Sequence, residues 1–172
     1  MPDHKWDLSR LSAGERSALK RNAGTMMNAA AADAIEGFYR ALTAKVHQYE
    51  EPAWFAALCM QCLWRENDNP QVRSFPEMLR TIYQNPDATE SSRKKCTGYL
   101  DIIWGNDGFL LGKICSLVRS MRSENAAVMP DFEELADDLS RWNHPDRLIQ
   151  RKWLRIICSN NQNNEEEKEN VD

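Results

Sequence analysis

Residues 131–158 read DFEELADDLSRWNHPDRLIQRKWLRIIC, and this stretch decides the fold class. Its pattern predicts two helices joined by a turn at residues 143–145 (Asn-His-Pro), because proline disfavours helix at the residue before it. Asp131 is placed to cap the first helix, and Glu134 three residues later completes the pattern of a capping box. The apolar face of that helix consists of Phe132, Leu135, Leu139 and Trp142.

The second helix of this pair is predicted to begin at Asp146 and to display a row of arginines. Its apolar side holds Ile149, Trp153, Ile156 and Ile157. Arg147, Arg151 and Arg155 recur at every fourth position, so a helix would place them in one line roughly 6 Å apart. Lys152 flanks this row. The spacing is comparable to that of phosphates along an extended strand, so a polyanionic partner would explain the row without any catalytic group.

The rest of the chain also has a helical pattern. Apolar periodicity and capping residues predict further helices within residues 12–24, 26–47, 52–64, 75–83, 92–104 and 106–121. Strand-like alternation is absent, and only seven glycines leave few hairpin turns. We therefore predict an all-α fold, a compact bundle-like packing of about seven or eight helices with no sheet. Residues 1–160 would form a single all-helical domain, and residues 161–172 a disordered acidic tail.

The length and composition favour an independently folding protein. A chain of 172 residues with six tryptophans can bury roughly 70% of its unfolded surface. No apolar run approaches 18 residues and the first residues lack a signal-peptide pattern, so we expect no membrane association. Five cysteines, an odd number without framework spacing, suit a reducing compartment. These features together predict a cytoplasmic protein.

The candidate catalytic and metal-binding patterns favour structural roles. Cys59 and Cys62 form a C-x-x-C pair inside an apolar helix, and no second pair supplies the other ligands of a zinc site, so core packing explains them better. The three histidines are scattered, and no phosphate-binding loop or nucleophile motif occurs. Asp137 and Asp138 point to different faces of a helix, which favours an acidic surface facing solvent or a partner over a Mg²⁺ site. We predict no enzyme activity, no cofactor and no metal.

The net charge of −4 is concentrated at one end of the chain. Five of the 26 acidic and one of the 22 basic residues lie in residues 165–172, which leaves 21 of each in the remainder. Within that neutral remainder, charges of one sign are clustered in segments: residues 9–24 and 141–160 are basic, whereas residues 131–138 are acidic. Such clustering allows a protein without net charge to have a basic face that can bind nucleic acid.

Ten basic residues are the candidate nucleic-acid contacts. They are Lys20, Arg21, Arg93, Lys94, Lys95, Lys113, Arg147, Arg151, Lys152 and Arg155. Lys20 and Arg21 end a helix, where positive charge also suits the helix dipole. Arg93, Lys94 and Lys95 are predicted at a helix start, the unfavourable end for positive charge, so a ligand explains them better than the fold does.

Three segments resemble the CasB family. Asp-Leu-x-x-Trp at residues 138–142, followed by a proline turn and an Arg/Gln-rich run into tryptophan, is similar to the C-terminal part of that family. Residues 14–21 (GERSALKR) resemble its Gly-Asp-Arg-Ala-x-Leu-Arg-Arg segment, and residues 38–40 its Phe/Leu-Tyr-Arg helix. The chain departs from the pattern at Lys20, where the family has arginine, in residues 65–90, which align poorly, and in the acidic tail.

The resemblance implies the small subunit of Cascade, the type I-E CRISPR surveillance complex. Its relatives are all-helical and non-enzymatic, and they assemble as two copies with the other Cascade subunits beside guide RNA, target DNA and the displaced non-target strand. By resemblance, this chain would bind nucleic acid non-specifically and stabilise the R-loop in antiviral defence. Strand exchange in an R-loop is nearly balanced in free energy, so holding the displaced strand can tip it. The residues themselves leave an alternative open: a helical protein–protein adaptor with no direct nucleic-acid contact.

Overall fold

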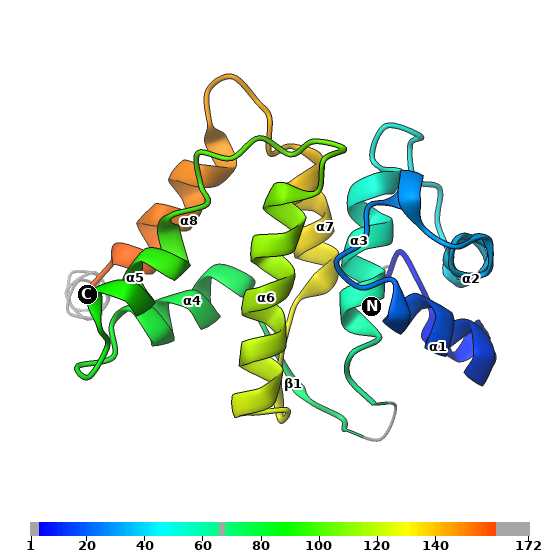
Figure 1. Cartoon of the computed structure of the whole chain (residues 1–172), viewed down its shortest axis with the longest axis horizontal. Coiled ribbons are helices and arrows are strands. Elements are labelled where there is room, and N and C mark those ends of the chain that lie inside the picture. Colours follow the sequence, from blue (N-terminus) through cyan, green and yellow to red (C-terminus); the bar gives the residue numbers. More distant parts are fainter. Residues whose placement is uncertain (1–3, 66–67, 161–172) are drawn as a thin grey trace, which may run out of the picture.

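The computed structural model describes residues 4–65 and 68–160, which contain eight α-helices (Figure 1). The helices are α1 (Ala13–Arg21), α2 (Ala32–Ala41), α3 (Glu51–Gln61), α4 (Phe75–Tyr83), α5 (Glu90–Thr97), α6 (Phe109–Glu124), α7 (Phe132–Ser140) and α8 (Leu148–Cys158), with short 3₁₀ turns η1 (Leu8–Arg10) and η2 (Met27–Ala29). In Figure 1, α6 stands between α1–α3 on one side and α4, α5 and α8 on the other. The predicted mainly helical architecture is confirmed.

The prediction of no sheet is wrong. Strands β1 (Gln71–Arg73) and β2 (Val128–Pro130) pair in parallel, with Val72 opposite Met129. The pairing continues into the N-cap of α7, since the Asp131 backbone N–H donates to the Arg73 carbonyl at 2.7 Å. Strands of three residues are too short to show alternation in sequence, and their pairing depends on segments brought together only by folding.

Helix α3 is the centre of the core and packs mainly against α7 and α1. Every residue from Ala53 to Met60 is buried, so this helix is apolar on all sides. Pro52 lies in its first turn, at the start of the helix predicted within residues 52–64. Cys59 and Cys62 are buried in the same core, which confirms the packing role predicted for them, and burial raises the pKa of the Cys62 thiol to about 12.

Several predicted helices differ in their limits. Residues 26–47 do not form one helix: η2 is followed by extended backbone at Ala30 and Ala31, and α2 begins only at Ala32. The exposed alanines of this run do not form an apolar face that packing against the core would stabilise. The Asn22 side chain accepts a hydrogen bond from the Ala31 N–H, which stabilises the interruption. Helix α6 begins at Phe109, after Gly108 adopts a positive φ of 74°.

The predicted tail, residues 161–172, lies outside the described residues, so its predicted disorder stays a prediction. Among the residues that the structure describes, no helix is both long enough and apolar enough to cross a membrane.

Candidate nucleic-acid interface

A lysine-lined cleft of about 720 Å³ lies between α5 and α6. Its basic residues are Lys94 and Lys95 from α5 and Lys113 from α6, and all three side chains are exposed. Serine hydroxyls complete the polar lining, at Ser91, Ser116 and Ser120. Lys113, Ser116 and Ser120 share one face of α6 because they recur at intervals of three and four residues. The face of α6 opposite them is apolar and buried in the core.

The lining of the cleft carries an excess of positive charge. Lys95 and Lys113 have no ion-pair partner among the described residues, and Lys94 pairs only with Glu90, 3.4 Å away on the same exposed surface. Glu90 is also the one acidic residue among those that line the cleft. Ammonium and hydroxyl groups donate hydrogen bonds to phosphate oxygens, and such charge-assisted bonds are stronger than neutral ones.

The helix that carries these lysines begins earlier than the sequence predicts. Thr89 caps α5 by accepting a hydrogen bond from the Ser92 N–H, and the helix starts at Glu90. Lys94 and Lys95 therefore lie in its last turn, where positive charge suits the helix dipole. The predicted placement at an unfavourable helix start is wrong, so the argument for a ligand rests on the cleft instead. Arg93 turns away and donates from Nε to the Tyr83 carbonyl at 3.2 Å.

The predicted row of three arginines on α8 is reduced to two. Arg147 precedes the helix in a left-handed conformation with φ of 52°, because the turn after Pro145 extends to this residue and α8 begins at Leu148. Its guanidinium group donates to the Leu100 carbonyl at 3.1 Å and to Asp101 at 2.6 Å, so it ties α8 to the segment after α5. Arg151 and Arg155 remain exposed, and neither has an ion-pair partner within the described part of the chain.

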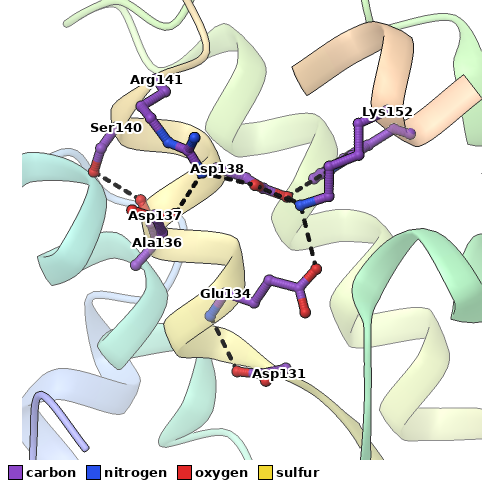
Figure 2. Close-up of polar contacts among 9 residues, drawn as sticks. Asp131, Glu134, Ala136, Asp137, Asp138, Ser140, Arg141 and Lys152 are labelled. Atoms are coloured by element: carbon purple, nitrogen blue, oxygen red, sulfur yellow. Dashed lines mark hydrogen bonds and ion pairs between the residues drawn. The ribbon is translucent and has the colours of Figure 1, made fainter. Parts of the chain in front are cut away.

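Lys152, which the sequence predicts as a nucleic-acid contact, is paired with two carboxylates of its own chain. Its ammonium group lies 2.8 and 3.0 Å from the two carboxylate oxygens of Asp138 and 3.4 Å from Glu134 (Figure 2). Asp138 is only 1% exposed and also accepts a 2.7 Å hydrogen bond from the indole of Trp153. Burial by itself lowers the pKa of Lys152, but the hydrogen bonds and charges of Asp138 and Glu134 outweigh it and leave that pKa raised.

Most of the acidic block at residues 131–138 is engaged within the fold, and of its five carboxylates only that of Asp137 is exposed. Asp131 caps α7 by accepting from the Glu134 N–H at 3.0 Å, as the sequence predicts. The Glu134 carboxylate points to Lys152 instead of completing a capping box, and burial raises its pKa although the charge of Lys152 opposes the rise. Glu133 accepts from the Lys5 N–H at 2.9 Å. Asp137 pairs with Arg141 on the outer face of α7.

The end of α1 contributes one unpaired cation. Lys20 is exposed and has no ion-pair partner among the described residues, whereas Arg21 donates to Ser17 at 3.0 Å and lies 3.7 Å from Asp33. Six predicted contacts therefore have no ion-pair partner among the described residues: Lys20, Arg93, Lys95, Lys113, Arg151 and Arg155. Of these, Arg93 is hydrogen-bonded to a backbone carbonyl. The cleft brings together only Lys94, Lys95 and Lys113. The sequence prediction did not assign the three cleft serines to the site, although the spacing of Lys113, Ser116 and Ser120 indicates that two of them share a helix face with Lys113.

The described residues contain no group of three or more histidine, cysteine, aspartate or glutamate side chains placed to hold a metal ion. His144 instead stabilises the turn before α8, where its Nδ1 accepts from the Asp146 N–H at 3.1 Å.

Comparison with known proteins identifies the family. The family described as CRISPR-associated protein Cse2 matches residues 15–156 of this sequence. The chain belongs to the Cse2/CasB family. Two solved structures are similar to this member of the family in fold. One, described as a CRISPR RNA-guided surveillance complex, has a TM-score of 0.68 and 18% identity over 94% of this chain and 89% of that one.

The second is CasB from M. ruber, with a TM-score of 0.66 and 15% identity over 94% of this chain and 92% of that one. No curated protein matches the sequence. The family assignment agrees with the resemblance that the tryptophan-containing segment and residues 14–21 show. At identities below 20%, the two structures establish a shared fold for this Cse2/CasB chain.

Proposed function

We propose that this chain is the non-catalytic small subunit of a type I-E CRISPR RNA-guided surveillance complex and that it binds a nucleic-acid strand in the cleft between α5 and α6. The observation that carries the proposal is the convergence of Lys94, Lys95 and Lys113 on one cleft with a single carboxylate on its lining. The family and the fold of a surveillance-complex chain support it.

The cleft chemistry suits the sugar–phosphate backbone better than the bases. Ammonium and hydroxyl groups bind phosphate oxygens whatever the sequence, and such contacts position a strand without reading base edges. The lysines are exposed, so most of their contribution would come from release of counterions that had condensed on the nucleic acid. Binding of this kind is sequence-independent and weakens steeply as salt rises.

This mode of binding fits the stabilisation of an R-loop. The RNA–DNA hybrid that forms is about as stable as the DNA duplex that it replaces, so protein contacts to the backbone can decide the balance. A subunit that holds the displaced strand needs no base recognition and no catalytic group. We propose that Arg151 and Arg155 on the exposed face of α8, and Lys20 at the end of α1, add further phosphate contacts. The guide RNA, both DNA strands, the other subunits and a second copy of this chain are the proposed partners.

The test measures the affinity of the Lys95→Gln/Lys113→Gln double variant for a short oligothymidylate. Fluorescence anisotropy gives this affinity at a series of salt concentrations. If both lysines neutralise phosphates, the slope of log affinity against log salt should flatten by about 0.7 per lost contact on a single strand. Lys45→Gln is the matched control, since Lys45 is exposed, has no ion-pair partner among the described residues and lies between α2 and α3, away from the cleft.

The adaptor alternative predicts a different result. An unchanged salt slope in the double variant, together with failed incorporation into the assembled complex, would show that the lysines dock a protein. Circular dichroism of each variant separates this outcome from loss of fold.

A further inference from the structure

The described chain ends close to the helix that carries the lysine cleft. The carbonyls of Ile157 and Ser159 accept hydrogen bonds from the Gln84 side chain at 3.0 and 2.6 Å, which ties the end of α8 to the end of α4. The neighbouring carbonyl of Tyr83 accepts from Arg93 of α5. These three helix segments therefore meet at one side of the molecule, the side that carries α4, α5 and α8 in Figure 1.

The sequence after this point is strongly acidic. Residues 165–172 (EEEKENVD) contain five acids and one lysine. Four uncharged residues, 161–164 (NQNN), separate them from Asn160. A span of four residues reaches at most about 14 Å, and an α-helix with its side chains is about 10 Å across. The acidic segment is therefore long enough in reach to arrive at α5 and the cleft beside it.

We propose that residues 165–172 occupy the lysine cleft of their own chain and compete there with nucleic acid. The charges are complementary, because Lys94, Lys95 and Lys113 meet only Glu90 within the cleft. This inference rests on the proposed function for the identity of the competitor, but the docking of the segment can be observed without any nucleic acid.

The proposed contact between the acidic segment and the cleft is weak, and its strength depends on the salt concentration. Exposed carboxylate–ammonium pairs each contribute little and are screened by salt. A tethered segment compensates through its effective concentration, which reaches the millimolar range when the connection is short. A continuous phosphate strand carries a denser charge and releases counterions on binding, so it would displace the segment. The segment would thus suppress binding of short or sparse polyanions by the free subunit.

Docking is tested with a nitroxide label in the full-length chain. Cys158 is the one exposed cysteine of five, so a Cys158→Ser/Asn170→Cys variant takes the label near the acidic residues. At low salt, NMR amide signals of α5 and of Lys113 should broaden, and they should sharpen at high salt. The matched control carries the same label with Glu165, Glu166, Glu167 and Glu169 all changed to Gln. Equal broadening in that control would show mere proximity and would overturn the inference.

Competition is tested with the same four Glu→Gln changes in the unlabelled chain. This variant should bind a short oligothymidylate severalfold more tightly at low salt, and the difference should vanish at high salt. Equal affinities, with binding still dependent on Lys95 and Lys113, would sink the tail inference and leave the proposed function intact. If no variant binds the oligonucleotide but charge-dependent broadening persists, the docking stands and nucleic-acid binding by the free chain fails.

Discussion

Asp138 and Trp153 are joined by a 2.7 Å hydrogen bond from the indole Nε1 to a carboxylate oxygen, which connects α7 to α8 inside the core. Trp153 is fully buried, and its ring lies against Trp142 and Phe75 at centroid distances of 5.1 and 5.2 Å. Lys152 supplies the compensating charge from the half-exposed side. A buried carboxylate is costly without partners, so this contact favours one packing of α8 over alternatives.

Removal of the Asp138 carboxylate should destabilise the fold. Asp138→Ala leaves the buried Trp153 N–H without an acceptor and the Lys152 ammonium group with Glu134 alone, so urea denaturation should show a loss of about 2–4 kcal/mol in unfolding free energy. The control is Asp137→Ala, one position along on the exposed face, which should cost less than about 0.5 kcal/mol. Equal effects of the two changes would contradict the structural role of Asp138.

The contribution of the Asp138–Lys152 pair should disappear at high pH. The pKa of Lys152 is raised above its ordinary value of 10.5, so the folded state holds this proton more tightly than the unfolded state. The stabilisation is complete below that value and is lost as pH rises through the raised pKa. The difference in unfolding free energy between the wild type and Asp138→Asn should therefore be constant at neutral pH and shrink in alkali. A difference in unfolding free energy that grew in alkali would contradict this prediction.

Substitutions of Arg147 and of Arg151 should have different effects, the first on stability and the second on nucleic-acid binding. Arg147→Gln removes the bonds to Leu100 and Asp101 and should lower the unfolding free energy by about 0.5–1.5 kcal/mol, with little effect on oligonucleotide affinity. Arg151→Gln with Arg155→Gln should leave the unfolding free energy nearly unchanged and weaken binding at low salt. Denaturation and anisotropy on the same samples measure both. A fold that collapses without Arg151 and Arg155 would assign these residues to the structure.

Thiol chemistry should distinguish one cysteine from the other four. Burial raises the pKa of Cys62 to about 12 and that of Cys96 to about 11, and Cys59 and Cys115 also shift upward for the same reason. At about pH 8 these thiols stay protonated and enclosed, so a chromogenic disulfide reagent should titrate only Cys158 in the native protein. All five should react after unfolding. Rapid native reaction of more than one thiol would contradict the buried core.

The purified chain should not cleave DNA or RNA when Mg²⁺ or Mn²⁺ is added. Gel assays of single-stranded and duplex substrates measure this directly. Metal-dependent cleavage that follows the protein through purification, and that is lost in Asp137→Asn, would overturn the proposal of a non-catalytic subunit.

The sequence by itself determined the helical class and many local signals. Asp131 caps α7 as predicted, and residues 75–83 form α4 with the predicted limits. The apolar positions of α7 and α8 that the pattern indicated are buried, with Ile156 partly so. These features depend on residues a few positions apart, so hydrogen bonds and side-chain periodicity within one segment are enough to specify them.

Only the tertiary structure decided which charges are free. Arg147 and Lys152 look equivalent to Arg151 in sequence, yet one is held by Asp101 and the other by Asp138. The cleft likewise exists because folding places α5 and α6 on its two sides, and β1 pairs with β2 for a similar reason. Burial and partner choice are set by contacts between segments far apart along the chain, and no local pattern encodes those contacts.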